Sequence, residues 1–516
     1  MSGNRNNQVM SEKKINSALI SVFYKEGLDK VVKVLHDLGV KIYSTGGTYN
    51  FIEELGIPAE KVEDLTTYPS ILGGRVKTLH PLVFGGILAR RGNKNDMEQV
   101  SRYKIPPIDL VIVDLYPFEE TVRSIDDEQE IIEKIDIGGI SLIRAAAKNY
   151  DDVLIISKRE QYPGLLTLLN EKKGYSNISE RRHYAAEAFL VSSGYDTAIF
   201  KYFNHREGIT AFRESIDINY PLRYGENPHQ RGIFFGDPEQ LFDKLHGKEI
   251  SYNNLLDIES GLNLIDEFSN TTVVIIKHNN ACGVATRQNL SDAWQAALAC
   301  DPVSAYGGII VTNVTIDEVT ADLIDKIFFE IIITPGYSGK ALEILRHKKN
   351  RIILQRKLRV AGEYNFRSLL NGVLWQERDR ATEAAKDMNP VTKRLPGPEE
   401  IDDLVFANKI VKHSKSNAIV LAKDLQLCAS GIGQTSRVDS LKQAIDKARL
   451  FGFNLEGSVM ASDAYFPFAD SVEIAHKAGV KAIVQPGGSV RDQDSIDYCS
   501  ANGIAMVFTG IRHFKH

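Results

Sequence analysis

The feature that most constrains this fold is a repeated alternation of apolar, strand-like runs with amphipathic helical stretches. From residue 16, "SALISVF" is followed by "LDKVVKVLHDLGV", in which apolar residues recur at helical spacing, and then by "KIYSTGG" and "TYNFIEELG". The run "DLVIVDLYPF" is apolar almost without interruption before its proline, which is typical of a parallel strand buried on both faces. This pattern predicts a doubly wound α/β domain over residues 15–213.

A second α/β region is predicted over residues 214–516. Strand-like runs such as "TTVVIIKH", "GGIIVTN" and "GIAMVFTG" again alternate with helical stretches. The segment 386–400, "KDMNPVTKRLPGPEE", is rich in proline and charge and is interpreted as a linker. Residues 1–14 are polar and lack the apolar stretch of a signal peptide, so they are expected to form a disordered leader.

Length and charge argue against several classes of protein. A chain of 516 residues is too long for one core. A formal charge of −5 argues against nucleic acid or an anionic membrane surface as the main partner, so an anionic substrate would need a local basic pocket. No apolar run reaches the roughly 18 residues of a membrane span. The four cysteines are far apart and form no C-x-x-C pair, which favours free thiols and a cytoplasmic location.

Loops of the first domain carry residues suited to binding anions and moving protons. "STGGT", residues 44–48, lies between a strand and a helix, where free backbone N–H groups hold phosphate, although ordinary tight turns share this pattern. "LGGRVKTLHP", residues 72–81, is either a solvated basic loop or an anion and carbonyl clamp built on Arg75. Tyr116 follows a strand at the edge where open α/β sheets bind ligands, and Asp136 precedes a helix.

In the second region, "IIKHNNACGV" ends an apolar run on two adjacent proton-handling residues, Lys277 and His278. Successive strand residues face opposite sides, so both can reach one ligand only if the chain turns at this point. A single histidine at a strand end is more often structural, and Cys282 is more often a small buried thiol than a nucleophile. A zinc deaminase site is not supported because the chain has no P-C-x-x-C sequence, and no metal site is predicted.

Ten motifs occur in order along the chain: "STGGT", "GGRVKTLHP", "LYPF", "DIGG", "RAAAKN", "RYGENPHQ", "DPVSAYGG", "SDAYFPF", "QPGGSVRD" and "RHF". With these motifs, residues 15–516 resemble the bifunctional purine biosynthesis proteins, which join AICAR formyltransferase to IMP cyclohydrolase. The resemblance implies a methylglyoxal-synthase-like N-terminal domain that closes FAICAR to IMP. It also implies two cytidine-deaminase-like α/β units, without zinc, that form FAICAR from AICAR.

The same resemblance implies partners and cofactors. The formyl donor would be 10-formyltetrahydrofolate, used as a co-substrate, with no tightly bound cofactor. The protein would be a homodimer with transferase sites at the subunit interface. Whether a monovalent cation binds is left open.

The resemblance assigns residues to the cyclohydrolase site. Its catalytic residues would be Lys148, as the proton-transfer residue, together with Lys77, Tyr116 and Asp136. The residues that would bind FAICAR or IMP are Ser21, Phe23, Tyr24, Lys25, Thr45, Gly46, Gly47, Thr48, Arg75, Val76, Thr78, Val113, Asp114, Ile137 and Gly138. Many relatives have an acid where this chain has Tyr24, and an asparagine where it has Asp114.

In the transferase, the resemblance makes His278 the base and Lys277 the group that stabilises the transition state, with Asn417 as a further donor. Histidine titrates near neutral pH and suits removal of a proton from the weakly nucleophilic AICAR amine. The residues that would contact AICAR are Arg223, Tyr224, Gly307, Glu330, Tyr465 and Arg512. Those on the folate side would be Arg437 and Asp470.

Two other functions share parts of this pattern. Methylglyoxal-synthase-like domains also serve as allosteric sensors, and the replacements at Tyr24 and Asp114 would suit binding without turnover. A lyase that acts on a phosphorylated carbonyl through the first domain is the other alternative. The set of Lys77, Asp136 and Lys148 argues against the sensor, and the motifs of the second region argue against the lyase.

Overall fold

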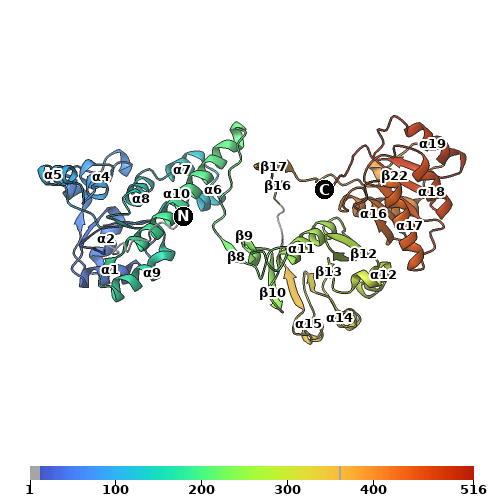
Figure 1. Cartoon of the computed structure of the whole chain (residues 1–516), viewed down its shortest axis with the longest axis horizontal. Helices are drawn as coiled ribbons and strands as arrows, with labels where there is room; N and C mark the ends of the chain where they lie inside the picture. Colours follow the sequence, from blue (N-terminus) through green and yellow to red (C-terminus); the bar gives the residue numbers. More distant parts are fainter. Residues whose placement is uncertain (1–11, 359–361) are drawn as a thin grey trace, which may run out of the picture. The chain divides into compact units, whose positions relative to one another are not determined.

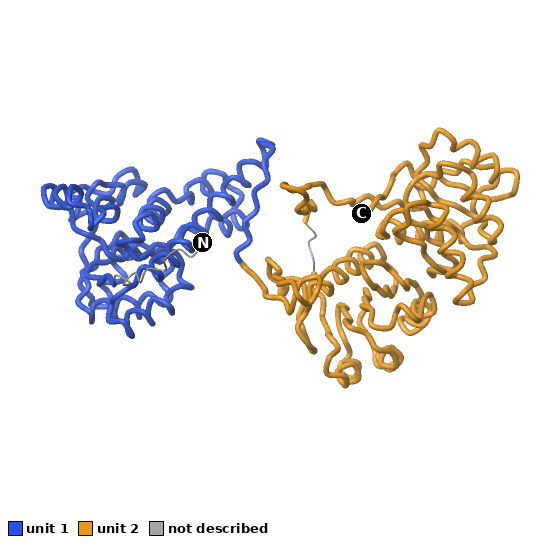
Figure 2. Tube along the Cα trace, viewed as in Figure 1, with its two compact units in different colours: residues 1–217 blue, residues 218–516 orange. Residues whose placement is uncertain are grey.

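The computed structural model describes residues 12–358 and 362–516. The chain divides into two compact units, unit 1 (residues 1–217) and unit 2 (residues 218–516), shown in Figures 1 and 2. The boundary predicted between residues 213 and 214 lies close to this division.

Two residues of the predicted N-terminal leader form part of unit 1. Residues 1–11 lie outside the described part of the chain, but Lys13–Lys14 form strand β1, which pairs with β7 (Tyr175–Ser176). The side chain of Lys13 also donates to Asp152, at 2.8 Å. The predicted leader is therefore wrong at residues 13 and 14, because main-chain pairing and an ion pair hold them on unit 1.

Unit 1 is built on five parallel strands in the spatial order β4-β3-β2-β5-β6. The strands are β2 (Ser17–Ser21), β3 (Lys41–Ser44), β4 (Glu60–Lys61), β5 (Leu110–Val113) and β6 (Leu154–Ile156). The chain proceeds outwards from β2 to β3 and β4, and then returns to β5 on the other side of β2. The order of strands therefore reverses between β2 and β5, which is where open α/β sheets bind ligands.

Helices cover both faces of this sheet, because alternate strand residues point to opposite faces. Ile20 and Ile112 pack with α1, α2 and α9, whereas Leu19 and Val111 pack with α3, α4, α8 and α10. The helices of unit 1 are α1 (Leu28–Asp37), α2 (Gly46–Glu54), α3 (Val62–Thr66), α4 (Pro81–Leu88), α5 (Lys94–Arg102), α6 (Phe118–Ser124), α7 (Glu128–Glu133), α8 (Gly138–Lys148), α9 (Tyr162–Glu171) and α10 (Ile178–Glu207). The predicted doubly wound α/β domain is confirmed.

Unit 2 contains one mixed sheet of twelve strands in the order β10-β15-β14-β13-β11-β12-β20-β19-β21-β22-β23-β18. The strands are β10 (Phe242–His246), β11 (Thr272–Lys277), β12 (Asn280–Thr286), β13 (Ile309–Thr312), β14 (Ile331–Thr334), β15 (Ile352–Arg356), β18 (Asn389–Pro390), β19 (Ile419–Lys423), β20 (Gln426–Gly431), β21 (Val459–Ser462), β22 (Ala482–Gln485) and β23 (Ala505–Phe508). The orders β12-β11-β13-β14-β15 and β20-β19-β21-β22-β23 match. The sheet therefore consists of two like halves, which meet where Ala285 pairs with Gln426.

The helices of unit 2 follow the same division. Those helices are α11 (Tyr252–Ile265), α12 (Leu290–Cys300), α13 (Pro302–Ala305), α14 (Glu318–Asp325), α15 (Gly339–Arg346), α16 (Pro398–Lys412), α17 (Arg437–Leu450), α18 (Asp470–Ala478) and α19 (Asp492–Ala501). One face is covered by α11 and α16, which share a core across both halves. The other face has two cores, with α12, α14 and α15 on the first half and α17, α18 and α19 on the second.

The segment predicted as a linker, residues 386–400, contains regular structure near both ends, and residues 391–397 between them lie in no helix or strand. Its residues Asn389–Pro390 form β18, which pairs with β23, and α16 begins at Pro398. Proline is tolerated at the edge of a sheet and in the first turn of a helix, so a proline-rich composition does not exclude regular structure at these positions. The expected α/β units are thus two halves of one sheet.

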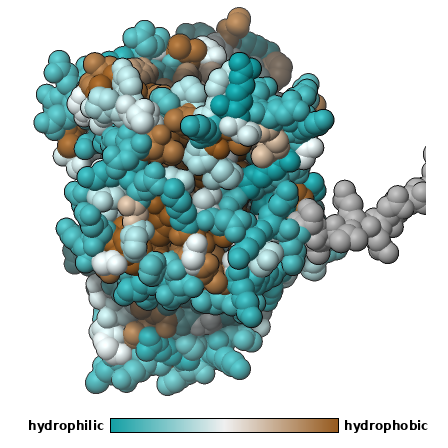
Figure 3. Space-filling model, turned by 90° about the vertical axis from the view of Figure 1, so that its left-hand side faces the viewer, coloured by the Kyte–Doolittle hydropathy of each residue, from teal (hydrophilic) through white to brown (hydrophobic). Residues whose placement is uncertain are grey.

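Two antiparallel ribbons lie outside the main sheet of unit 2. They are formed by β8 (Asn219–Pro221) with β9 (Ile233–Phe235), and by β16 (Tyr364–Leu369) with β17 (Gly372–Glu377). The face drawn in Figure 3 is largely hydrophilic, with hydrophobic side chains gathered in separate patches. Over the described ranges, no helix has both the length and the apolar character of a membrane span.

Candidate active sites

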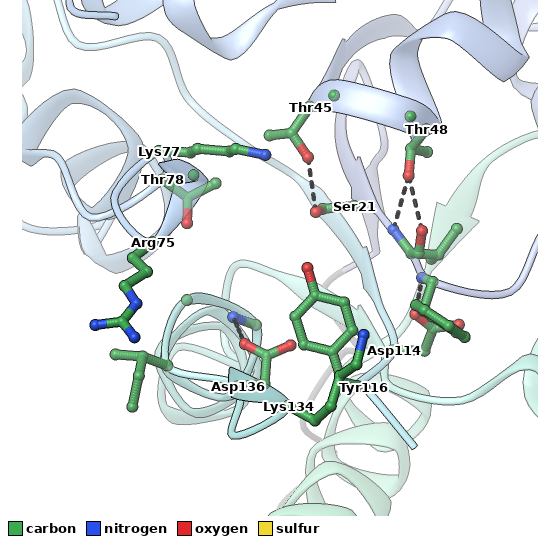
Figure 4. A pocket seen from close by; sticks show the side chains of 18 of the residues that line it. Ser21, Thr45, Thr48, Arg75, Lys77, Thr78, Asp114, Tyr116, Lys134 and Asp136 are labelled. Atoms are coloured by element: carbon green, nitrogen blue, oxygen red, sulfur yellow. Dashed lines mark hydrogen bonds between the residues drawn. The ribbon is translucent and has the colours of Figure 1, made fainter. Parts of the chain in front are cut away.

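A cavity of about 790 Å³ lies at the carboxyl ends of β2 and β5 in unit 1 (Figure 4). This is the switch point of the sheet, where two neighbouring strands lead into loops that separate from each other. The predicted residues that line it are Ser21, Phe23, Lys25, Thr45, Gly46, Gly47, Thr48, Arg75, Val76, Lys77, Thr78, Asp114, Tyr116, Asp136, Ile137 and Gly138. The fold therefore brings together loops that are distant in the sequence.

Residues 45–48 form the N-terminal turn of α2, and this turn lines the cavity. Thr48 binds the main chain of Val22 twice, donating from its hydroxyl to the carbonyl at 2.9 Å and accepting from the N–H at 3.1 Å. The hydroxyls of Ser21 and Thr45 are 2.8 Å apart. Gly46 has a φ of 43°, and a Cβ there would lie 3.4 Å from Nζ of Lys77. An anion at this helix N-terminus would meet both free N–H groups and a lysine.

Basic side chains from separate loops gather around the cavity. Lys25, Arg75, Lys77 and Lys134 all line it, which supplies the local basic pocket that an anionic substrate needs in a chain of net negative charge. Arg75 forms an ion pair with Glu133, and both side chains are mostly exposed. A pair of this kind contributes little to stability and can be exchanged for a bound anion.

Asp136 lies at the start of α8 and accepts a hydrogen bond from the N–H of Gly139, at 2.6 Å. Burial raises the pKa of Asp136, and backbone donors, Gly139 among them, oppose this shift. The N–H of Asp136 donates to the Tyr195 hydroxyl at 2.8 Å, and that hydroxyl donates to the Lys134 carbonyl at 2.9 Å. Tyr195, on α10, therefore fixes the segment that carries Lys134 and Asp136.

An aromatic wall forms another side of the cavity. The rings of Phe23 and Tyr116 meet edge to face, with centroids 5.6 Å apart, and Nζ of Lys134 lies 5.8 Å from the centre of the Tyr116 ring. Burial raises the pKa of Tyr116, and the charges of Asp136 and Asp114 add to this shift. The phenol therefore stays protonated at neutral pH and can donate a hydrogen bond to a substrate oxygen.

Asp114 holds the turn after β2. Its carboxylate accepts hydrogen bonds from the N–H groups of Phe23 and Tyr24, the latter at 3.1 Å. Lys25 donates to the carbonyls of Val22 and Phe23, and burial lowers its pKa. Burial raises the pKa of Asp114, against the pull of its two backbone donors. The replacements at positions 24 and 114 thus lie in one hydrogen-bonded turn.

In unit 2, β11 ends at Lys277 and the chain turns through His278 and Asn279 into β12. Both turn residues have positive φ, 52° and 64°, as a two-residue hairpin turn requires. Asp257 of α11 accepts from the N–H of Asn279 at 2.6 Å, while Nζ of Lys277 donates to the Tyr306 carbonyl at 2.6 Å. The chain therefore turns at His278 itself, directly after Lys277, which meets the condition for both side chains to reach one ligand, and His278 is exposed at the tip of the turn.

A buried network surrounds Asn417 in the second half of unit 2. Arg437 donates to Asp463 at 2.5 Å, to the Asn417 side-chain oxygen at 3.1 Å and to the Tyr465 carbonyl at 3.2 Å. The hairpin of the first half bonds to the segment that leads into this network, because the side-chain oxygen of Asn280 accepts from the N–H of Lys415, two residues before Asn417, at 3.3 Å. Residues from both halves therefore meet at one end of the sheet.

Comparison with known proteins identifies the relatives of this chain. The family model described as "AICARFT/IMPCHase bienzyme" matches residues 146–447, and the one described as "MGS-like domain" matches residues 27–141. A bifunctional purine biosynthesis protein PurH from Bacteroides thetaiotaomicron is 61% identical over 98% of this chain and 100% of its own length. The chain belongs to the AICARFT/IMPCHase bienzyme family.

Other relatives in this bienzyme family are similar in sequence over nearly the whole chain. PurH proteins from Aquifex aeolicus and Chloroflexus aurantiacus are 46% and 47% identical, over 97% and 98% of this chain and all of their own length. A solved structure described as the crystal structure of ForH is 34% identical over 36% of this chain and 96% of its own, with a TM-score of 0.33. The chain is a bifunctional enzyme of purine biosynthesis, with AICAR formyltransferase and IMP cyclohydrolase activities.

Three residues assigned to the bienzyme's cyclohydrolase lie outside the lining of the cavity. Val113 is buried within β5, and the hydroxyl of Tyr24 donates to Glu120 instead, at 3.1 Å. Lys148 is exposed at the last residue of α8, about 15 Å along the helix from Gly138, which is the end that lines the cavity. The structure does not bring Lys148 to this cavity.

The residues assigned to the bienzyme's transferase fall into several groups. Gly307 lies close to Lys277, since a Cβ on Gly307 would be 3.9 Å from Nζ of Lys277. Glu330 precedes β14, which is separated from β11 by β13, and its carboxylate forms an ion pair with Lys248 at 2.6 Å. Asn417, Arg437 and Tyr465 share the network described above. The remaining residues are exposed or partly exposed in other segments: Arg223 and Tyr224 stacked near β8, Asp470 at the start of α18, and Arg512 over Phe514 near the C-terminus.

Sequence reasoning missed several residues that shape these sites. Lys134, Glu133 and Tyr195 belong to the first site, and Asp257 belongs to the second. The basic position two residues before "DIGG" could have indicated Lys134. Cys282 is buried, and burial raises its pKa to about 12, which fits a structural thiol.

Proposed function

We propose that the two activities are divided between the two units. Unit 1 closes FAICAR to IMP, and unit 2 transfers the formyl group of 10-formyltetrahydrofolate to AICAR. The observation that carries this proposal is the separation of two different kinds of chemistry. A basic cavity with a candidate phosphate loop lies in unit 1. The Lys277–His278 turn lies in unit 2, where Asn280 bonds to Lys415, two residues before Asn417.

Ring closure in unit 1 is an intramolecular reaction. The carboxamide nitrogen attacks the formyl carbon of the same molecule, and water is lost, so proximity supplies much of the rate. The N-terminus of α2 and Lys77 would hold the phosphate, and Tyr116 would donate to the formyl oxygen. Lys148 keeps its assignment by motif, but Lys77 and Lys134 are lysines that line the cavity and could exchange protons with the substrate.

Formyl transfer in unit 2 needs a base and an oxyanion partner. The AICAR amine attacks the formyl carbon, a tetrahedral intermediate forms, and the bond from that carbon to the folate nitrogen breaks. His278 would take the proton from the amine, and a proton returns to the folate nitrogen as it leaves. Lys277 would stabilise the oxyanion. The Asn417 amide, which the motif assigns as a further donor, donates to the carbonyls of Gln434 and Thr435 at 3.0 and 3.3 Å, so it would have to exchange one of these bonds for the substrate. Arg437 is buried with its donors directed inwards, so we assign it to holding Asn417.

We further propose a cytoplasmic homodimer in which the two halves of unit 2 are cytidine-deaminase-like units without zinc. The β16–β17 ribbon exposes Phe366, Leu374 and Trp375, each about half accessible, and a two-stranded ribbon alone is marginally stable. A second subunit would cover it. A monovalent cation would suit Asp463, whose buried Oδ2 has no hydrogen-bond partner among the described residues.

The test is a coupled assay with the full chain. AICAR and 10-formyltetrahydrofolate are supplied, and tetrahydrofolate, FAICAR and IMP are measured over time. Equal amounts of tetrahydrofolate and IMP are expected. FAICAR that accumulates and closes no faster than it does without enzyme would overturn the assignment to unit 1, and a lack of tetrahydrofolate would overturn the assignment to unit 2.

A further inference from the structure

The C-terminal segment after β23 is docked on unit 2 by its main chain. The N–H of His513 donates to the Asp463 carbonyl at 3.0 Å. Two residues later, the Lys515 carbonyl accepts from the N–H of Ser416 at 2.9 Å, and the N–H of Lys515 donates to the Ser416 hydroxyl at 3.1 Å. The segment thus bonds to the residue before Asn417 and to the aspartate that Arg437 holds.

His513 is the buried anchor of this segment, with 3% of its surface exposed. Its Nδ1 lies 2.6 Å from a carboxylate oxygen of Asp379, and its Nε2 lies 3.1 Å from one of Glu383. Ionised carboxylates only accept hydrogen bonds, so both ring nitrogens must carry protons, and the ring is an imidazolium. Although burial lowers the pKa of His513, the bonds to Asp379 and Glu383 raise it to about 9.

The two carboxylates are themselves fixed. Glu383 is 3% exposed and accepts from the side chain of Asn408 on α16, at 2.7 Å. Asp379 lies in the same segment as Glu383, and Lys412 of α16 is the other cation whose charge reaches it. The imidazolium therefore joins three elements: the C-terminal segment, the segment before β18, and α16.

We propose that His513 is a positioning residue of the formyl transfer site, and that its imidazolium locks the C-terminal segment against Ser416, Asn417 and Asp463. The proposal rests on the proposed role of Asn417 as an oxyanion donor. Without the charge, Asp379 and Glu383 would face an uncharged ring and could not both be satisfied, which releases the segment. Asn417 would then lose the main-chain support at Ser416, and small displacements of a catalytic group are costly in rate.

Protonation gives the proposal a pH signature. The folded pKa of about 9 lies above the value of about 6.5 of a free histidine. The contribution of His513 to stability is therefore complete below about pH 6.5, and it is lost as the pH rises through about 9. Formyl transfer should decline over the same range.

The test compares His513→Gln with His513→Lys and with the matched control His516→Gln, an exposed histidine in the same segment. The kcat and KM of formyl transfer are measured from pH 7 to 10, and closure of supplied FAICAR is measured in the same preparations. We expect His513→Gln to lower the transfer kcat on the order of tenfold or more at pH 7.5. We also expect it to lack the decline near pH 9, while closure and the His516→Gln variant stay unchanged.

His513→Lys separates positioning from loss of folding, because it keeps a cation at this position. It should retain more formyl transfer than His513→Gln. Its transfer activity should decline at a higher pH than that of the wild type. Equal transfer in wild type and His513→Gln, with the same pH profile, would overturn the inference. So would a His513→Lys variant as impaired as His513→Gln. Absence of transfer in the wild type would instead refute the proposed function.

Discussion

The two candidate sites of this enzyme are built in opposite ways. In unit 1, the loops after three neighbouring parallel strands lead into one cavity, and the N-terminus of α2 and the basic side chains face it together. In unit 2, a hairpin of one half-sheet meets a network of the other half, and His278 lies exposed at the tip of its turn. The first site lies at one edge of a single sheet, and the second lies at the junction between the two halves of unit 2.

This difference indicates which contacts each activity depends on. The cavity of unit 1 is held by bonds between the loops that surround it, such as those of Thr48 to Val22 and of Asp114 to Phe23 and Tyr24. The site of unit 2 depends on residues that hold hairpins and chain ends in place, such as Asp257 and His513. Substitutions away from the reacting groups should therefore affect the transferase more strongly than the cyclohydrolase.

The largest effect is expected from His278→Ala. Loss of the base should reduce formyl transfer by about 10²- to 10⁴-fold, while closure of supplied FAICAR stays at the wild-type rate. Tetrahydrofolate release and FAICAR closure are measured separately, with His347→Ala as an exposed histidine control. If both activities fall together, the two sites are not independent and the comparison fails.

A reciprocal effect is expected from Lys77→Met. Removing the cation beside Gly46 should slow closure of FAICAR on the order of 10²-fold and leave formyl transfer intact. Lys33→Met, an exposed lysine of α1 outside the cavity, serves as the control. Unchanged closure by Lys77→Met would remove Lys77 from the site.

An intermediate effect is expected from a matched pair of aspartates in unit 2. Asp257 accepts from the turn at Asn279, and Asp403 of α16 accepts from the equivalent turn, at 2.9 Å from Asp424 and 2.7 Å from Leu425. Asp257→Asn should lower transfer on the order of tenfold, since it frees the turn that carries His278. Each substitution should lower the free energy of unfolding by about 1–3 kcal/mol. Asp403→Asn should not lower the rate of formyl transfer in the way that Asp257→Asn does.

Equal transfer rates in these two variants would show that the hairpins have no separate roles. Circular dichroism melting curves of both variants establish whether their stabilities match, so that only the difference in rate is interpreted.

The smallest effect is expected from Asp114→Asn. The amide keeps one acceptor and loses the other, which costs about 1 kcal/mol and should raise the KM for FAICAR about fivefold with little change in kcat. Burial raises the pKa of Asp114, so wild-type closure should weaken on the acid side at a higher pH than for an ordinary aspartate. The variant should lack this acid limb, and a variant with the wild-type profile would contradict the role of the carboxylate.

Local signals explain why much of the first site could be predicted. Glycine turns between strand and helix, and polar residues at strand ends, specify loops such as residues 45–48 and the region of Tyr116 without knowledge of the tertiary fold. Tyr195 could not be found in this way, because it lies 59 residues from Asp136 and reaches it only through packing of α10. Lys148 is the opposite case. A motif assigned it to the cyclohydrolase site, but it lies at the end of α8 that is remote from the cavity.

The architecture of unit 2 was predictable only in part. Alternation of strands and helices indicated α/β units, but the composition of residues 386–400 did not indicate strand β18, because composition cannot report that β23 provides an edge for it. The two matching halves of the sheet could not be recognised from the sequence either. Topology repeats in them without an obvious repeat of sequence, and backbone pairing rather than side-chain identity defines strand order.

Unit 2 holds the same hairpin twice, and the second copy lacks the histidine that we propose as the base. Asp424 and Leu425 take the positions that His278 and Asn279 take in the first half, and their carbonyls bond to Arg287 and Thr286 across the junction. In a duplicated half-sheet, one hairpin can keep the catalytic residues while the other hairpin only joins the two halves. We therefore expect the Asp424–Leu425 turn to accept new residues through evolution, as long as Asp403 and a left-handed turn persist, while Lys277–His278 does not vary.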